Sequence, residues 1–176
     1  MLFPSHDRGG SGTASGTFHR VTASGEVSYA QGYSLASGLA SHAEGGYDGK
    51  NIRPTSATTA SAHAEGAGTL ASADMSHAEG VDAIASGIAS HAEGSNTIAS
   101  GGASHAEGAD TIASGASSHA EGDSTTASGT TSHAEGFGTV AGGTYSHAEG
   151  NTARASGQQS HAEGFETVAS GLSSHA

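Results

Sequence analysis

The sequence predicts an all-β fold, a parallel β-roll (β-solenoid) built from 14-residue coils. The pentapeptide Ser-His-Ala-Glu-Gly recurs with a spacing of 14 residues from Ser76 to Gly164. Between its copies lies a second motif of related form, such as Thr97-Ile98-Ala99-Ser100-Gly101. A fixed period of this kind is the sequence signature of a solenoid, in which one repeat stacks on the next. Two motifs, each a short strand and a turn, then make one coil.

Each half of the 14-residue unit predicts a strand rather than a helix. A seven-residue period is also typical of coiled coils, but these halves lack apolar a and d positions. They also carry a Gly every seven residues, which costs about 1 kcal/mol each in a helix interior. Alternation along a strand points the Ser/Thr and Ala positions inward. His and Glu then occupy one outer face, and mostly Ile, Val or Leu with Ser occupy the other.

The repeat domain spans residues 26–176. Residues 1–25 contain only fragments of the motif, such as Thr22-Ala23-Ser24-Gly25, and we expect an irregular N-terminal cap or junction there. The step from His42 to His63 is 21 residues instead of 14, which predicts a loop insertion near residues 46–60. The chain ends inside a tenth copy of the motif at Ser174-His175-Ala176, so we expect it to be a segment of a larger protein.

Composition restricts the partners of this segment. The chain has 17 acidic and 5 basic residues and a formal net charge of -12 with neutral His. Such a surface repels nucleic acid and anionic membranes, so we expect contact with neither. A coil with a core of Ala, Ser and Thr buries little apolar area, and we expect self-association, with a parallel homotrimer as the leading form.

Units such as Ser-His-Ala-Glu-Gly-x-x-Thr-Ile-Ala-Ser-Gly resemble the head repeats of trimeric autotransporter adhesins of the YadA type. They are also similar to repeats in phage tail-spike or fibre proteins that carry a self-cleaving intramolecular chaperone domain. The resemblance covers about residues 26–176 and implies a left-handed parallel β-roll assembled as a trimer. It also implies an extracellular location, on a bacterial cell surface or a phage virion. The chain departs from the adhesin pattern by placing His and Glu where that family tends to place Val and Ile.

The His and Glu rows are the main candidate functional residues, as interface or ladder positions. The two residue types never change among the nine complete copies, whereas the matching position of the other half varies and includes Thr126 and Arg154. We therefore favour the His/Glu face as the subunit interface, with the Ile/Val/Leu face as the competing assignment. The candidates are His42, Glu44, His63, Glu65, His77, Glu79, His91, Glu93, His105, Glu107, His119, Glu121, His133, Glu135, His147, Glu149, His161 and Glu163.

Other chemistries are weaker interpretations of the same rows. Ser, His and Glu occur close together, but neighbouring strand residues point to opposite sides, so we predict no catalytic residues, no enzyme activity and no cofactor. Metal binding is the sharper alternative for His and Glu on one face, although a uniform ladder suggests no selective site, and we assign no metal ligands. Ice binding would require an exposed Thr row, whereas the Thr column is assigned inward.

The function that the sequence favours is a structural or attachment segment of a trimeric surface fibre, either a bacterial adhesin head or a phage tail fibre or spike. The alternative is a module that contacts a host receptor or matrix ligand. For that alternative the candidate ligand loop contains Tyr47, Lys50 and Arg53, which combine an aromatic ring with two basic residues outside the lattice. Because imidazole titrates near pH 6.5, we also expect acidity near pH 5 to 6 to alter assembly.

Overall fold

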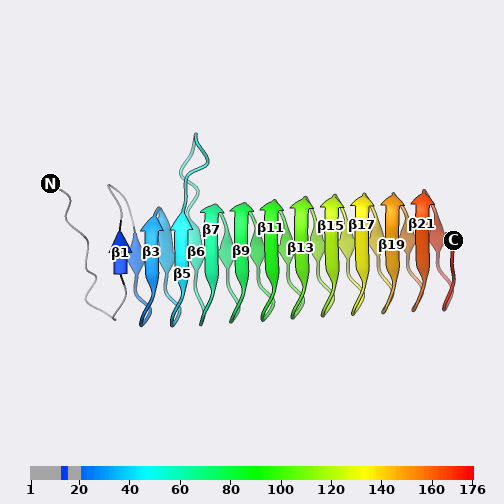
Figure 1. Cartoon of the computed structure of the whole chain (residues 1–176), viewed down its shortest axis with the longest axis horizontal. Helices are drawn as coiled ribbons and strands as arrows, with labels where there is room; N and C mark the ends of the chain where they lie inside the picture. Colours follow the sequence, from blue (N-terminus) through cyan, green and yellow to red (C-terminus); the bar gives the residue numbers. More distant parts are fainter. Residues whose placement is uncertain (1–12, 16–20) are drawn as a thin grey trace.

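The computed structural model describes residues 13–15 and 21–176, which form an all-β parallel solenoid of about eleven coils. The strands stand side by side along the long axis, with residues 13–15 toward one end and the C-terminus at the other (Figure 1). No helix occurs in these residues, and none is therefore long and apolar enough to cross a bilayer. The all-β, 14-residue solenoid predicted from the repeat is confirmed.

Two parallel sheets of eleven strands each make the two outer faces of the solenoid. The odd-numbered sheet contains the His-Ala-Glu-Gly motif in most of its strands. Its strands are β1 (Thr13–Ser15), β3 (Tyr29–Gly32), β5 (His42–Gly45), β7 (His63–Ala67), β9 (His77–Val81), β11 (His91–Ser95), β13 (His105–Ala109), β15 (His119–Asp123), β17 (His133–Phe137), β19 (His147–Asn151) and β21 (His161–Phe165).

The even-numbered sheet is built from the second motif and has shorter strands. They are β2 (Thr22–Ala23), β4 (Ser34–Ala36), β6 (Thr55–Ala57), β8 (Leu70–Ala71), β10 (Ile84–Ala85), β12 (Ile98–Ala99), β14 (Ile112–Ala113), β16 (Thr126–Ala127), β18 (Val140–Ala141), β20 (Arg154–Ala155) and β22 (Val168–Ala169).

The register sets like residues over like throughout the regular coils. His91 pairs with His105, and Glu93 pairs with Glu107, in strands β11 and β13. Because strand neighbours lie about 4.8 Å apart, each repeated residue forms a row along the solenoid. The 14-residue period seen in the sequence is therefore the coil length.

The core between the sheets consists of small residues. The Ala of each motif is almost fully inaccessible, and the Ser or Thr two residues earlier is buried beside it. Several of these serines close the turn that precedes them: Ser104 Oγ donates to the Gly101 carbonyl at 2.7 Å, and Ser118 Oγ does the same to Gly115. The inward assignment of Ser/Thr and Ala is confirmed, and the buried Thr column is not available as an ice-binding surface.

Glycine is required where neighbouring coils approach each other. Gly94 ends its strand motif at φ 111°, and a Cβ there would lie 2.1 Å from the Gly108 carbonyl oxygen. Gly101 has no positive φ, yet its Cβ would lie 2.0 Å from the Gly115 oxygen. Both positions therefore set how closely coils stack.

The irregular parts lie toward the N-terminus. Strands β1 and β2 fall within residues 1–25 and pair with β3 and β4, while residues 1–12 and 16–20 of that expected cap lie outside the described residues. The insertion leaves the stack after β5 and protrudes from one edge (Figure 1). Its base is closed where Arg53 N donates to the Gly46 carbonyl at 2.9 Å, and a bridge joins Tyr47 to Ile52. Strand β6 begins at Thr55, inside the expected range of 46–60.

Candidate functional site

The outward side chains of the odd-numbered sheet form what we call the His/Glu face. Alternation along each His-Ala-Glu-Gly strand buries the Ala and leaves His and Glu partly exposed on the same side. The structure thus brings all eighteen candidates, His42 to Glu163, into two parallel rows, one of imidazoles and one of carboxylates. The face runs along the solenoid without interruption from β5 to β21.

The histidines form a continuous stack of rings. Neighbouring centroids from His42 to His175 lie 4.6 to 4.9 Å apart, and the ring planes differ by 1 to 12°. The stacking follows from the parallel register, because the coil spacing and the ring spacing are nearly the same. In nine of these rings, from His42 to His161, the Nε2 atom is inaccessible to solvent and has no hydrogen-bond partner.

Each Nε2 instead faces a carboxylate at a distance longer than a good hydrogen bond. Within a coil, the distance from Nε2 to the Glu Oε2 two residues later is 3.4 Å for His77 and His91 and reaches 4.0 Å for His119. Some carboxylates also approach the next coil: Glu107 Oε1 lies 3.9 Å from His119 Nε2. These His side chains are about one-third exposed, at 35 to 39%.

Burial keeps several imidazoles neutral. Desolvation lowers the pKa of His63, His77, His119 and His133 below the ordinary value of 6.5, and the neighbouring imidazoles lower it further. The nearby glutamates act in the opposite direction and do not outweigh these causes. An uncharged stack is therefore the favoured state at neutral pH.

Three neighbouring carboxyls, those of Glu107, Glu121 and Glu135, share protons. Hydrogen bonds to Glu107 and Glu135 raise the pKa of Glu121 to about 7, and the same bonds lower the pKa of the two neighbours. Carboxyl groups in adjacent coils cannot all ionise without electrostatic repulsion, so the Glu121 carboxyl keeps its proton and forms hydrogen bonds with its neighbours. The row carries a strong negative potential that a cation would relieve.

The ends of the rows include residues that the sequence interpretation left out. Tyr29 takes the His position in β3 and packs edge-on against His42 with centroids 4.9 Å apart, and its hydroxyl donates to Gln31 Oε1 at 2.7 Å. His175 extends the stack beyond β21. The motif Ser28-Tyr29-Ala30-Gln31-Gly32 carried the signal, since Tyr and Gln stand at the His and Glu positions.

Two histidines and one glutamate come close enough for a metal ion at five places, with one potential ligand atom from each residue within 4.8 Å of the others. The motif serine lies on the other side of the strand from these ligands: Ser104 Oγ faces the core and donates to the Gly101 carbonyl. The five groups are His77/Glu79/His91, His91/Glu93/His105, His105/Glu107/His119, His133/Glu135/His147 and His161/Glu163/His175.

The protruding loop does not gather its three candidate residues at one point. Tyr47 is exposed at the loop stem, and Lys50 is exposed at the tip, where its backbone N–H and that of Asn51 donate to the Asp48 carboxylate. Arg53 turns back to form an ion pair with Asp82. This pairing could not be predicted from the repeat, because Asp82 lies two coils further along the stack.

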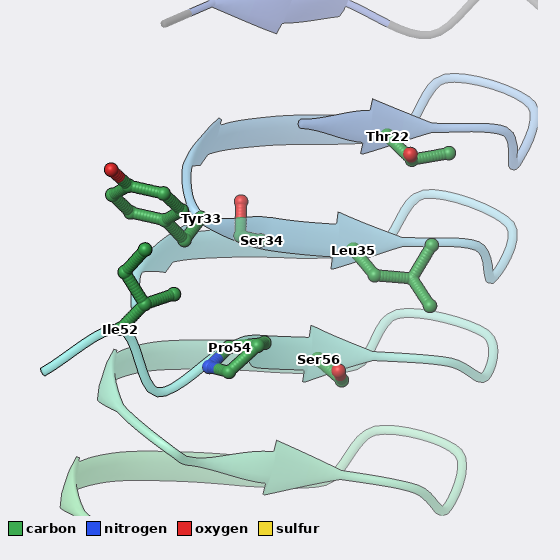
Figure 2. A pocket seen from close by; sticks show the side chains of 7 residues that line it. All are labelled: Thr22, Tyr33, Ser34, Leu35, Ile52, Pro54 and Ser56. Carbon is green, nitrogen blue, oxygen red and sulfur yellow. The ribbon is translucent and has the colours of Figure 1, made fainter. Parts of the chain in front are cut away.

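A hollow of about 530 Å³ opens beside the loop on the even-numbered sheet. Figure 2 shows Tyr33 and Ile52 together at one end, with the other lining side chains projecting from neighbouring strands. Sequence reasoning missed this hollow because it forms between the insertion and the regular coils. It is lined by Thr22, Tyr33, Ser34, Leu35, Ile52, Pro54 and Ser56.

Comparison with protein-family models gives no match to this chain, and comparison with curated proteins finds no matching relative. The arguments that follow therefore depend on the geometry of the chain and on the repeat pattern.

Proposed function

We propose that this chain is a stiff structural or attachment segment of a trimeric surface fibre, and that it has no enzymatic role. The observation that carries the proposal is the unbroken parallel register from β3 to β21, in which backbone hydrogen bonds join each coil to the next. A rod of about eleven coils spans roughly 50 Å at the spacing of parallel strands. Such a rod holds modules at its two ends at a fixed separation.

The narrow core supports self-association as part of this function. Ala, Ser and Thr fill the space between the sheets, and each contributes little to the roughly 25 cal/mol gained per Å² of buried apolar area. Packing one outer face against other copies would add the missing burial. The resemblance of the 14-residue unit to YadA-type head repeats supports a left-handed roll in a parallel homotrimer, on a bacterial cell surface or a phage virion.

The His/Glu face is the surface that we assign to the trimer interior. Its two residue types are constant in nine copies, while the row on the even-numbered sheet accepts the exposed Arg154. The His and Glu side chains of this face are also about one-third exposed, so groups from a second copy could pack against them.

Sedimentation and small-angle scattering test the proposal. We expect a concentration-independent trimer with an elongated form. His105→Arg should weaken the trimer at least tenfold in dissociation constant, whereas Ile98→Arg, which copies the natural Arg154, should leave it intact. A compact monomer at micromolar concentration would contradict the fibre function, and the reverse pattern of the two variants would move the interface to the even-numbered sheet.

A second candidate function is ligand binding at the hollow beside the loop. The observation that favours it is an apolar depression lined by Tyr33, Leu35, Ile52 and Pro54, next to exposed Tyr47. A partner with an apolar group, on a host receptor or matrix protein, would fit this surface. Leu35→Ser should reduce adhesion to host cells or matrix, while Leu70→Ser, in the same row but outside the hollow, should not. Equal adhesion by both variants would reject this role.

A further inference from the structure

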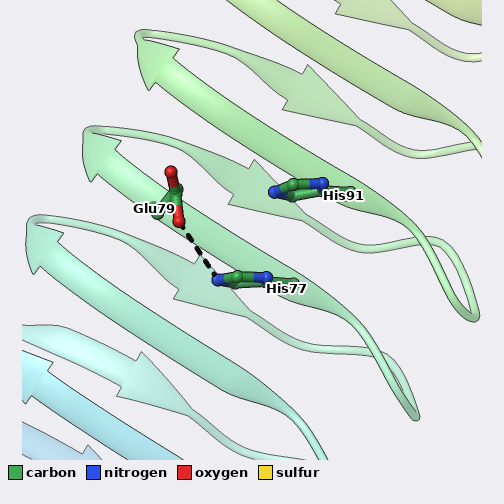
Figure 3. Close-up of side chains that lie close together, drawn as sticks. All are labelled: His77, Glu79 and His91. Carbon is green, nitrogen blue, oxygen red and sulfur yellow. Dashed lines mark ion pairs between the residues drawn. The ribbon is translucent and has the colours of Figure 1, made fainter.

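The His/Glu face repeats one arrangement of possible ligands along its length. In Figure 3, His77 and Glu79 of β9 lie beside His91 of β11, and a dashed line joins the Glu79 carboxylate to His77. His77 Nε2 and Glu79 Oε2 are 3.4 Å apart, and all three ligand atoms lie within 4.8 Å of one another. Two imidazoles and one carboxylate form a ligand set that suits zinc and similar divalent transition ions.

The distance from His77 Nε2 to Glu79 Oε2 corresponds to one edge of a metal coordination shell. Zinc bonds to His nitrogen and Glu oxygen are about 2.0 to 2.1 Å, so two ligands of a tetrahedral ion lie about 3.4 Å apart. A charge-assisted hydrogen bond would instead bring the two atoms to about 2.8 Å. The nitrogens of stacked rings must approach each other more closely than in the ion-free chain. Because the lone pair of each nitrogen lies in the plane of its ring, the two rings must also tilt toward each other to direct both lone pairs at one ion. Changes in the side-chain torsions of both histidines provide this movement, and the terminal torsion of His has a broad minimum.

The ligand atoms are available for a metal ion. The Nε2 atoms of His77, His91, His105 and His119 have no hydrogen-bond partner in the chain, so an ion would displace no existing bond. The parallel register fixes the spacing of the two histidines before binding, which lowers the entropy lost on coordination. The carboxylate row beside them attracts cations, because the parallel register sets the glutamates of successive coils next to one another.

We propose that the His/Glu face binds a row of divalent transition-metal ions of the zinc class, each held by a histidine, the glutamate two residues later and the histidine of the next coil. Each ion joins two adjacent coils. Three protein ligands leave a fourth coordination position for water or for a group from another molecule.

Sharing of histidines limits how many ions bind. A neutral imidazole offers one lone pair through Nε2, so one histidine cannot serve two ions through that atom. The group His91/Glu93/His105 shares a histidine with the groups on both sides, and the other four groups share no histidine with one another. The five groups therefore accommodate four ions per chain, in alternate coils, through Glu79, Glu107, Glu135 and Glu163.

This alternation provides a matched pair of variants on one surface. Glu107→Gln removes a carboxylate from an occupied group, and the best remaining arrangement of the five groups holds three ions. Glu93→Gln makes the same chemical change one coil away, in the group that the full arrangement leaves unused, so four ions should remain. Both variants keep the shape of the side chain and its place in the odd-numbered sheet.

The experiment uses tag-free protein that has been stripped with a chelator and dialysed against zinc chloride, followed by metal analysis of the protein. We expect four zinc ions per chain for the parent protein and Glu93→Gln and three for Glu107→Gln. Imidazole ¹⁵N spectra should show zinc-dependent shifts of Nε2 in the parent, and magnesium should produce none. Equal losses in the two variants, equal binding of magnesium, or no retained zinc would each overturn the proposal.

Sedimentation of the same samples keeps this inference separate from the fibre function. The ligands of each site come from one chain, so zinc binding by a monomer would support the metal sites while contradicting the trimer. A trimer that retains no zinc would do the reverse.

Discussion

Gly101→Ala gives a direct measure of how strictly glycine controls the stacking of coils. Its new Cβ would lie 2.0 Å from the Gly115 carbonyl oxygen, whereas carbon and oxygen atoms in contact are normally about 3.3 Å apart. The neighbouring coil would have to move by more than about 1 Å. Gly102→Ala is the matched control, because a Cβ there meets no atom closer than 4.0 Å. Neither glycine has a positive φ, so backbone conformation does not separate the two variants.

The cost follows from the hydrogen bonds at that turn. Moving the coil stretches the bonds from Ser100 N and Gly101 N to the Ala113 carbonyl, now 2.9 and 3.3 Å, and the bond from Ser117 N to the Gly102 carbonyl, now 2.8 Å. A buried backbone group left unpaired costs about 1 to 3 kcal/mol. Two or three such groups give a loss of about 3 to 5 kcal/mol, which lowers the melting temperature by roughly 10 °C in a chain of this size.

Thermal unfolding followed by far-ultraviolet circular dichroism measures the difference. Gly101→Ala should unfold roughly 10 °C below the parent, while Gly102→Ala should match the parent or exceed it slightly, because Ala restricts the unfolded chain. Hydrogen exchange should also accelerate at the amides of Ser100 and Ser117 in Gly101→Ala only. Equal melting temperatures for the two variants would refute the argument that backbone contact between coils requires glycine here.

Three further predictions concern charge, turn conformation and the loop. In metal-free buffer, the melting temperature should fall as the pH drops below 6.5, because the pKa values of His63, His77, His119 and His133 are lowered in the folded state and the unfolded chain binds protons first. Glu121 contributes to stability with the opposite sign, because its raised pKa means that its contribution is lost as pH rises through about 7. Glu121→Gln should therefore flatten the dependence of the melting temperature on pH above pH 6. A melting temperature that stays the same from pH 7 to pH 5 would contradict the histidine argument. Thr131 is β-branched at φ 54°, so Thr131→Asn should raise stability by about 1 kcal/mol and Thr130→Asn should not, as chemical denaturation would show. Deleting residues 47–52 should leave the melting temperature within a few degrees, because Arg53 N and the Gly46 carbonyl oxygen lie only 2.9 Å apart and the two residues can be joined directly; a large drop would mean that the loop supports the coils.

Much of the fold could be predicted from the sequence because the period and the burial pattern coincide. Every fourteenth residue pairs with its counterpart, and the small residues that alternate with His and Glu are the buried ones. The position of the insertion follows from the interval between His42 and His63. These features depend only on counting and on the two-residue alternation of strands.

The chemistry of the His/Glu face was less accessible to sequence reasoning. A repeat pattern places His and Glu in rows, but the separation of 3.4 Å between His77 Nε2 and Glu79 Oε2 depends on side-chain rotamers. Proton sharing by Glu121 depends in turn on contacts with both neighbouring coils. The hollow beside Tyr33 and the pairing of Arg53 with Asp82 arise where the irregular loop meets regular coils, and there the repeat gives no guidance.

The in-register pairing also makes the length of this rod adjustable in units. From β9 to β21 every coil presents nearly the same backbone to its neighbours, so removing or duplicating 14 residues would change the number of coils while each remaining junction stayed the same. Recombination between identical gene segments could therefore lengthen or shorten the protein in steps of about 4.8 Å without a new packing problem to solve. Selection could then change the length of the rod without changing the stability of each junction between coils.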